Sequence, residues 1–140
     1  MLVFLDANVV LDALLRRAPW HTEADNIFRL IAAGNIRGTI SALSLSHLYY
    51  IGRKQVGDEQ ARSHVAWCIH GFEIASVNRS TIERALALRG RDFEDSIQLA
   101  AAEQAGVDAI VTRNPADFAN SAIEVLSPGE LLARIGQPPP

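Results

Sequence analysis

The sequence predicts an α/β fold built on a mostly parallel sheet of about five strands. Short strand-like runs alternate with helical patterns along the chain, as expected when crossover helices connect parallel strands. Two runs, residues 2–5 and 109–112, are almost continuously apolar, which is typical of strands covered on both faces. With 140 residues, 49% hydrophobic and 21% charged, the chain has the size and composition of one globular domain with a sizeable core.

The first elements can be placed from apolar runs and turn residues. Strands are expected at residues 2–5, 39–42, 72–77, 109–112 and 123–126. Between the first two strands, an apolar stripe at helical spacing predicts a helix that ends at Gly34-Asn35. The members of this stripe are Trp20, Ala24, Ile27, Phe28 and Ile31.

The middle of the chain predicts a helical hairpin in place of a single crossover helix. Its two helices span residues 43–53 and 59–70, with a break at Gly57-Asp58. Ser80 and Glu83 are expected to form the capping box of the next helix. Later helices are expected at residues 93–105 and 128–135, with a short helical turn after Pro115.

The domain organisation is simple. A single domain is expected over residues 1–136, followed by a disordered tail at residues 137–140, where three prolines are consecutive. No apolar run approaches the roughly 20 residues that span a membrane, and the first strand follows Met1 directly, so no signal peptide is expected. The only cysteine, Cys68, is expected in the core. These features favour a cytoplasmic protein.

The charge balance excludes one class of function. A net charge of −3 does not suit a general-purpose nucleic-acid coat, which would be basic. A nuclease with a carboxylate site can still be acidic, because its bound cations invert the local field. Arg17 and Arg113 could contact RNA but are expected to be solvated surface charges. Asp12, on the first helix, could reach the edge of the sheet but is expected to face solvent.

Three acidic residues that are far apart in sequence are expected at one edge of the sheet. Asp6 follows the first strand, Asp117 lies five residues past Thr112 at the end of the fourth, and Asp95 begins the helix that leads into the fourth strand. In an open parallel sheet, ligand sites gather beyond the carboxyl ends of the strands. Carboxylates there suit Mg²⁺ or Mn²⁺, hard cations that prefer oxygen ligands, and such sites hydrolyse phosphodiester bonds.

Each acid taken alone also has a structural explanation. Asp95 occupies a helix start, where acids are stabilised by the helix dipole, and Asp117 would lie in a first turn capped by Asn114. A phosphotransfer or phosphatase-like domain would also have an aspartate after the first strand. Against it, Lys54 is the only lysine, whereas a receiver domain needs one late in the chain. Asn8 stands where a haloacid-dehalogenase phosphatase needs a second aspartate. The shared edge of the three acids therefore favours the metal site.

Three segments carry a family resemblance. Residues 4–8 (FLDAN), 92–100 (DFEDSIQLA) and 112–118 (TRNPADF), in this order and spacing, resemble the PIN domain, the fold of VapC-type toxins of bacterial toxin–antitoxin pairs. The resemblance implies a three-layer α/β/α sandwich and a Mg²⁺- or Mn²⁺-dependent endoribonuclease that hydrolyses RNA. It also implies frequent homodimers and, for a toxin, inhibition by a cognate antitoxin.

The resemblance also assigns site residues. By position, the catalytic and metal-binding acids of the family correspond to Asp6, Asp95 and Asp117. The polar positions that support such a site correspond to Asn8, Thr112 and Asn114.

One position departs from the family pattern. Where the third helix of the family usually has a glutamate, this chain has His47. The histidine has three open roles: a metal ligand, which would favour Mn²⁺, a phosphate contact when protonated, or an ordinary half-buried histidine. The missing acid leaves a second function open, a catalytically weak or inactive PIN-fold module that binds RNA or protein.

Overall fold

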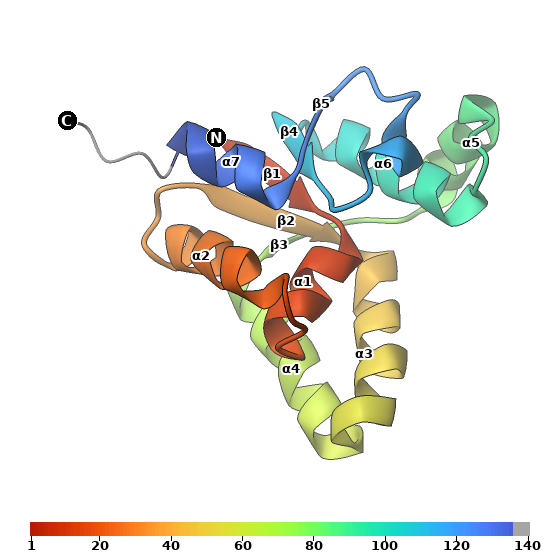
Figure 1. Ribbon diagram of the computed structural model, residues 1–140. Helices are drawn as coiled ribbons and strands as arrows, with labels where there is room; N and C mark the ends of the chain where they lie inside the picture. The colour runs from red at the N-terminus through yellow and green to blue at the C-terminus, as the bar shows by residue number, and fades with distance from the viewer. Residues whose placement is uncertain (136–140) are drawn as a thin grey trace.

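The sheet has five parallel strands. The computed structural model describes residues 1–135, so the predicted tail at 137–140 lies outside the described residues. The strands are β1 (Leu2–Leu5), β2 (Arg37–Ser41), β3 (Glu73–Ala75), β4 (Ala109–Val111) and β5 (Glu124–Leu126). They pair in the order β3-β2-β1-β4-β5, and each pair is parallel. The mostly parallel sheet expected from the sequence is confirmed (Figure 1).

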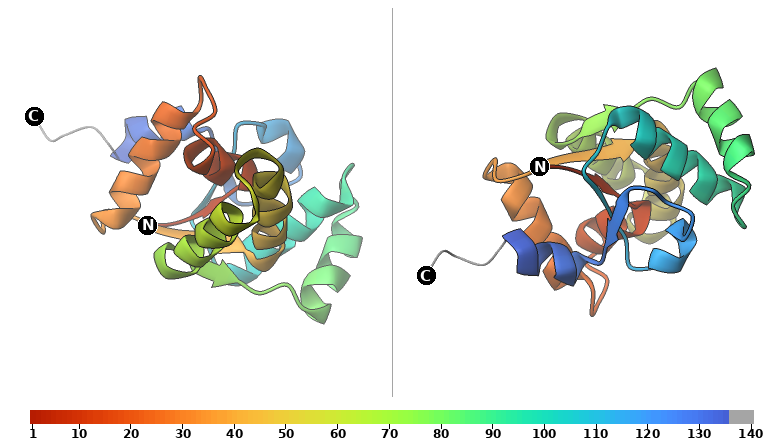
Figure 2. Two further views of the ribbon diagram at one scale, coloured as in Figure 1. Left: turned by 90° about the horizontal axis from the view of Figure 1, so that it is seen from below. Right: turned by 90° about the horizontal axis from the view of Figure 1, so that it is seen from above.

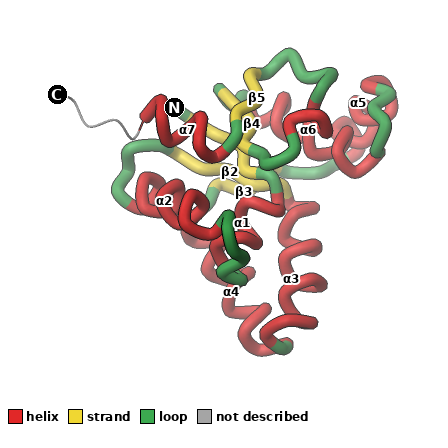
Figure 3. The backbone as a smooth tube through the Cα atoms, viewed as in Figure 1, coloured by secondary structure: helices red, strands yellow, loops and turns green. Residues whose placement is uncertain are grey.

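Helices cover both faces of this sheet. They are α1 (Ala7–Leu14), α2 (His21–Ala32), α3 (Ala42–Val56), α4 (Asp58–Gly71), α5 (Arg79–Leu88), α6 (Phe93–Ala105), the 3₁₀ turn η1 (Pro115–Phe118) and α7 (Pro128–Ile135). Seen from above, α5 and α6 lie across the sheet from α2 and α7 (Figure 2). Figure 3 shows the strands as the layer between them. Within residues 1–135, no helix is long and apolar enough to cross a membrane.

The alternation of side chains along β1 explains the three layers. Val3 and Leu5 belong to a core cluster shared with α1, α2 and α7, whereas Phe4 belongs to a second cluster shared with α6. Successive residues of a strand point to opposite faces, so an uninterrupted apolar strand supplies both cores. The three-layer α/β/α sandwich is confirmed.

The α3–α4 hairpin extends from the body of the domain (Figure 1). The two helices pack against each other and are joined at Gly57, which has φ 86°. This left-handed region is open to glycine at no steric cost. The predicted break at Gly57-Asp58 is therefore confirmed, and Cys68 on α4 is fully buried, as expected.

Two local predictions were wrong. The N-cap of α5 is Asn78, and its capping box is closed by Thr81, not formed by Ser80 and Glu83. Asn78 accepts from the Thr81 amide at 3.3 Å and its own amide donates to the Thr81 hydroxyl at 3.2 Å. Trp20, predicted in the apolar stripe of α2, precedes that helix and is 41% exposed. Its ring lies against the Arg113 side chain instead of the core.

Candidate active site

The carboxyl ends of β1 and β4 are joined by a short hydrogen-bond chain. Leu5 pairs with Val111 across the two central strands, and the Asp6 amide donates to the Val111 carbonyl at 3.0 Å. The Thr112 hydroxyl then donates to Asp6 Oδ2 at 2.9 Å and accepts from the Asn114 amide at 3.0 Å. Thr112 therefore fixes both the Asp6 carboxylate and the start of the loop that carries Asp117.

Burial and neighbouring charge both act on Asp6. Desolvation raises the pKa of its carboxyl group above the usual value. The hydrogen bond from Thr112 opposes this rise, and the negative charge of Asp117 adds to it. A carboxylate that is partly desolvated and repelled by another acid is one that a cation would stabilise.

Among the three acids, Asp95 has the pKa that burial and neighbouring charges raise furthest. It lies in the first turn of α6, where its amide donates to the N-cap Asp92 at 3.1 Å. Desolvation is the largest cause that raises the pKa of Asp95 to about 7, followed by repulsion from Asp117, Asp92 and Asp6 and then from Glu94. The three acids singled out in the sequence therefore lie within one another's electrostatic field.

The acid side chains remain spread around the edge of the sheet. Within residues 1–135, no three acidic, histidine or cysteine side chains are already gathered in positions that would hold one metal ion. Two hollows flank Asp95. The smaller, of about 140 Å³, includes Asp6, Asn8, His47, Glu94 and Gln98 in its lining; the larger, of about 510 Å³, includes Asp92, Asp117, Arg89 and Arg91. Asp95 therefore stands in the wall between two openings.

His47 is a half-buried residue beside another acid. Its side chain is 32% exposed, and Nε2 lies 3.6 Å from Glu94 Oε2. Sequence reasoning assigned no role to Glu94, although this residue directly precedes Asp95 in an acid-rich helix start. The structure thus places a carboxylate next to the histidine that replaces the usual glutamate.

Gln98 was also missed in the sequence. Its Oε1 accepts from the Ser41 hydroxyl at 2.6 Å, and its Nε2 donates to the Ser44 hydroxyl at 3.1 Å. Ser41 is the N-cap of α3 and all three residues are buried. This network links the second turn of α6 to the start of α3, and so relates Asp95 to His47. A glutamine inside a helix gives no pattern that would reveal such a partner.

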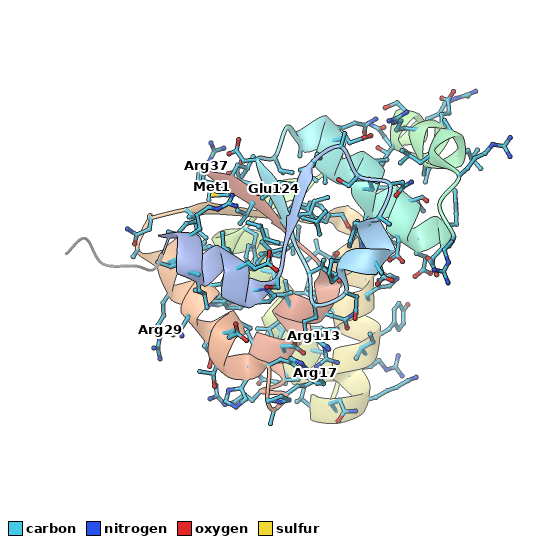
Figure 4. The ribbon with its side chains drawn as sticks, turned by 45° about the horizontal axis from the view of Figure 1, so that its top comes forward. Met1, Arg17, Arg29, Arg37, Arg113 and Glu124 are labelled. Carbon is cyan, nitrogen blue, oxygen red and sulfur yellow. The ribbon has the colours of Figure 1, made fainter. Side chains whose placement is uncertain are left out.

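The predictions that Asp12 faces solvent and that Arg17 and Arg113 are solvated surface charges were wrong. Only 1% of Asp12 is exposed, and its carboxylate accepts from Arg17 Nε at 2.8 Å and from Arg113 Nε and Nη2 at 2.7 and 3.3 Å. Arg17 Nη2 also donates to the carbonyl and side-chain oxygens of Asn8 at 3.2 and 3.3 Å. Figure 4 shows both arginines beside α1. The loop after β4 folds back over this face of α1, so Arg113 covers a carboxylate that a lone amphipathic helix would leave in water.

A pH-dependent stability is expected of the metal-free protein. Because the pKa of Asp95 rises from 3.8 to about 7, the folded state keeps a proton that the unfolded chain loses between these values. Stability should therefore fall as the pH rises from about 4 to 7 and then level off. Asp95→Asn should raise stability in EDTA at pH 8 by about 1–2 kcal/mol, less than the full shift because solvent screens the site.

Urea unfolding at pH 5 and pH 8 would measure both effects. Glu59→Gln, an exposed acid on α4, serves as the control and should leave the difference in stability between pH 5 and pH 8 unchanged. A variant Asp95→Asn that is no more stable than the parent at pH 8 would show that neither desolvation nor neighbouring acids destabilise the ionised Asp95 carboxylate.

Comparison with known proteins identifies the family. A model of the PIN domain family matches residues 2–116. Similar solved structures include DNA-bound VapBC of Salmonella typhimurium, with 20% identity over 91% of this chain and 99% of that chain and a TM-score of 0.72. Another is VapBC2 of Rickettsia felis bound to a promoter fragment, with 19% identity over 91% of this chain and 98% of that chain and a TM-score of 0.70. A third is VapC20 of Mycobacterium tuberculosis, a sarcin–ricin-loop-cleaving toxin, with 16% identity over 77% of this chain and 86% of that chain and a TM-score of 0.63. No match arises among curated protein sequences. The chain belongs to the PIN domain family.

Proposed function

We propose that this protein is a metal-dependent endoribonuclease and the toxin of a toxin–antitoxin pair. The observation that carries the proposal is that Asp6, Asp95 and Asp117 lie along one edge of the sheet, where desolvation, and then repulsion from Asp117, Asp92 and Asp6, raises the pKa of Asp95 to about 7. Mutual repulsion of this kind destabilises a protein unless a cation offsets it, so it points to a functional site. Membership of the PIN family supports the same chemistry.

The donor set fits Mg²⁺ or Mn²⁺. Asp6, Asp95 and Asp117 offer only carboxylate oxygens, the ligands that hard cations prefer. When bound, the ion supplies Lewis-acid activation of water and of the phosphoryl oxygen. Thr112 orients the Asp6 carboxylate, and Asn8 lines the hollow beside it. Asn114 precedes the Asp117 turn; its backbone carbonyl accepts from the Asp117 amide at 3.0 Å, and its side chain makes no cap hydrogen bond, contrary to the expected N-cap.

We further infer that Glu94 supplies the fourth carboxylate of the site, in place of the family glutamate whose position His47 occupies. The two side chains are 3.6 Å apart and share a hollow with Asp6. His47 Nε2 lies 3.6 Å from Glu94 Oε2, beyond hydrogen-bond distance, so the histidine would attract this carboxylate as an ion pair in its protonated form. The proposed site thus retains four carboxylates, one of them from α6 instead of α3.

The proposed partners follow from the similar structures. RNA is the proposed substrate, since the mycobacterial relative cleaves the sarcin–ricin loop. A cognate antitoxin is the proposed inhibitor, since relatives were solved as VapBC complexes. A homodimer, implied by the family resemblance, is the proposed assembly.

A turnover assay tests the activity. Substoichiometric protein should cleave RNA in Mg²⁺ or Mn²⁺ and lose cleavage in EDTA. The replacement of a family glutamate by His47 favours a second candidate, a PIN-fold module that binds RNA or protein without turnover. Binding without metal-dependent cleavage would favour that candidate; cleavage of many RNA molecules per protein would exclude it.

Metal binding should stabilise the folded protein. Millimolar Mn²⁺ or Mg²⁺ should raise the melting temperature, because the unfolded chain does not gather the acids. An ion at 100 times its dissociation constant contributes about 2.7 kcal/mol. Scanning calorimetry of the parent and Asp6→Asn would measure this shift, which should shrink in the variant. Equal melting temperatures with and without either ion would contradict a formed site.

A further inference from the structure

A small pocket is lined in part by Arg113, the residue that follows Thr112 in the chain. It has a volume of about 230 Å³ and is lined by Trp20, Glu23, Arg113, Ser127, Pro128 and Gly129. These residues come from the start of α2, the loop after β4 and the connection between β5 and α7. Pockets that enclose drug-sized ligands measure roughly 300–1,000 Å³, so this one suits a smaller group.

Arg113 is a rigid wall of the pocket. Asp12 holds it through two hydrogen bonds of 2.7 and 3.3 Å, and its guanidinium carbon lies 3.8 Å from the centre of the Trp20 ring. A guanidinium fixed between a buried carboxylate and an indole loses little freedom when a ligand arrives, which favours binding. Trp20 remains 41% exposed despite this contact.

The opposite wall is closed by Glu23 over Gly129. A Cβ atom at Gly129 would lie 2.7 Å from Glu23 Oε2, so the glycine lets the carboxylate approach the backbone. The pocket therefore combines an aromatic face, a guanidinium and a carboxylate. Stacking on aromatic rings and arginine planes recognises unstacked nucleobases, and a carboxylate accepts hydrogen bonds from exocyclic amino groups of bases.

The chain connects this pocket to the acids directly. Thr112, which donates to Asp6 at 2.9 Å, is the neighbour of Arg113. Two consecutive residues thus belong to the two places: Thr112 contacts Asp6, and Arg113 lines the pocket.

We propose that this pocket binds one unstacked nucleobase of the RNA substrate next to the cleavage site. The proposal rests on the proposed ribonuclease function and adds a determinant of its sequence preference. Trp20 and Arg113 supply the stacking surface, and Glu23 selects bases that carry an amino group at the reachable edge.

Fluorescence can report on the pocket without turnover. The chain has two tryptophans, so Trp67→Phe leaves Trp20 as the sole indole; Trp67 lies on α4, stacked on Phe28. In EDTA, single-stranded RNA should quench Trp20 emission to saturation. The same oligonucleotide with abasic sites should require at least about fivefold higher concentration, since base–aromatic stacking contributes roughly five- to 100-fold in affinity. Absent quenching, or equal quenching by abasic RNA, would overturn the proposal.

Kinetics separate the pocket from the activity. Trp20→Ala should raise KM about tenfold with kcat largely retained, Trp20→Phe should restore much of the loss, and Trp67→Phe should change neither. Glu23→Gln should change the order of preference among the four bases, whereas Glu130→Gln should not. If the variants cleave RNA with unchanged KM and unchanged base preference, the proposed base-binding role of the pocket is wrong, whereas the proposed ribonuclease activity stands. If RNA quenches Trp20 in a base-dependent way but the protein cleaves no RNA, the base-binding role of the pocket is supported and the ribonuclease activity is contradicted.

Discussion

Asp6→Asn is expected to reduce RNA cleavage by more than about 10²-fold while leaving the protein folded. The asparagine keeps the size of the side chain and can still accept a hydrogen bond from Thr112. It removes the negative charge with which Asp6 would bind the proposed metal ion. Partners that only orient a metal ligand cost about 10–100-fold when lost, so a ligand should cost more. Single-turnover cleavage in Mn²⁺ is the measurement.

A graded comparison sharpens this result. Thr112→Val removes the 2.9 Å hydrogen bond to Asp6 and keeps the shape, so cleavage should fall by about 10–100-fold. Asp25→Asn, away from the acids and paired with Arg16 and His21, should leave it unchanged. If Asp6→Asn cleaves RNA at the parent rate, the assignment of the metal site is wrong.

Asp12→Ala is expected to destabilise the protein by about 3–5 kcal/mol. The substitution leaves Arg17 and Arg113, with side chains 31% and 19% exposed, facing each other without the carboxylate between them. Removing one partner of a buried ion pair has a cost of this size because the remaining charge is uncompensated. Urea denaturation, with the slope checked for two-state behaviour, gives the value.

An exposed ion pair provides the control. Glu73 accepts from Arg37 through two bonds of 2.8 Å, a geometry as good as that at Asp12, but both side chains are at least half exposed. Glu73→Ala should therefore cost no more than about 1 kcal/mol. Similar losses for the two variants would mean that Asp12 contributes no more than a surface pair.

The parallel sheet and the edge that carries the acids could be predicted from the sequence because their signals are local. A buried apolar strand followed by an acid, as at Leu2–Asp6, predicts both the strand and the sheet edge at which the acid lies. The predicted helix at residues 93–105 has the same bounds as α6, Phe93–Ala105, because Asp92 and Gly106 are standard cap residues at its two ends.

The remaining parts depend on contacts between distant segments. Asp12 is polar on a short helix, and nothing near it shows that Arg113, 101 residues away, covers it. The cap of α5 was placed two residues late because Ser80 and Glu83 match the usual pattern, whereas Thr81 binds back to Asn78 and to Gln104 on α6. The partners of Gln98 and Glu94 are likewise set by how α3 packs beside α6.

The hydrogen bond between Thr112 and Asp6 joins residues 106 positions apart, and this has a consequence during synthesis. A ribosome-bound chain that ends before residue 109 has neither β4 beside β1 nor Thr112 and Asp117 near Asp6. The proposed nuclease therefore cannot assemble its acidic edge until β4 and the loop that follows it have left the ribosome, whatever the state of the segments made before them.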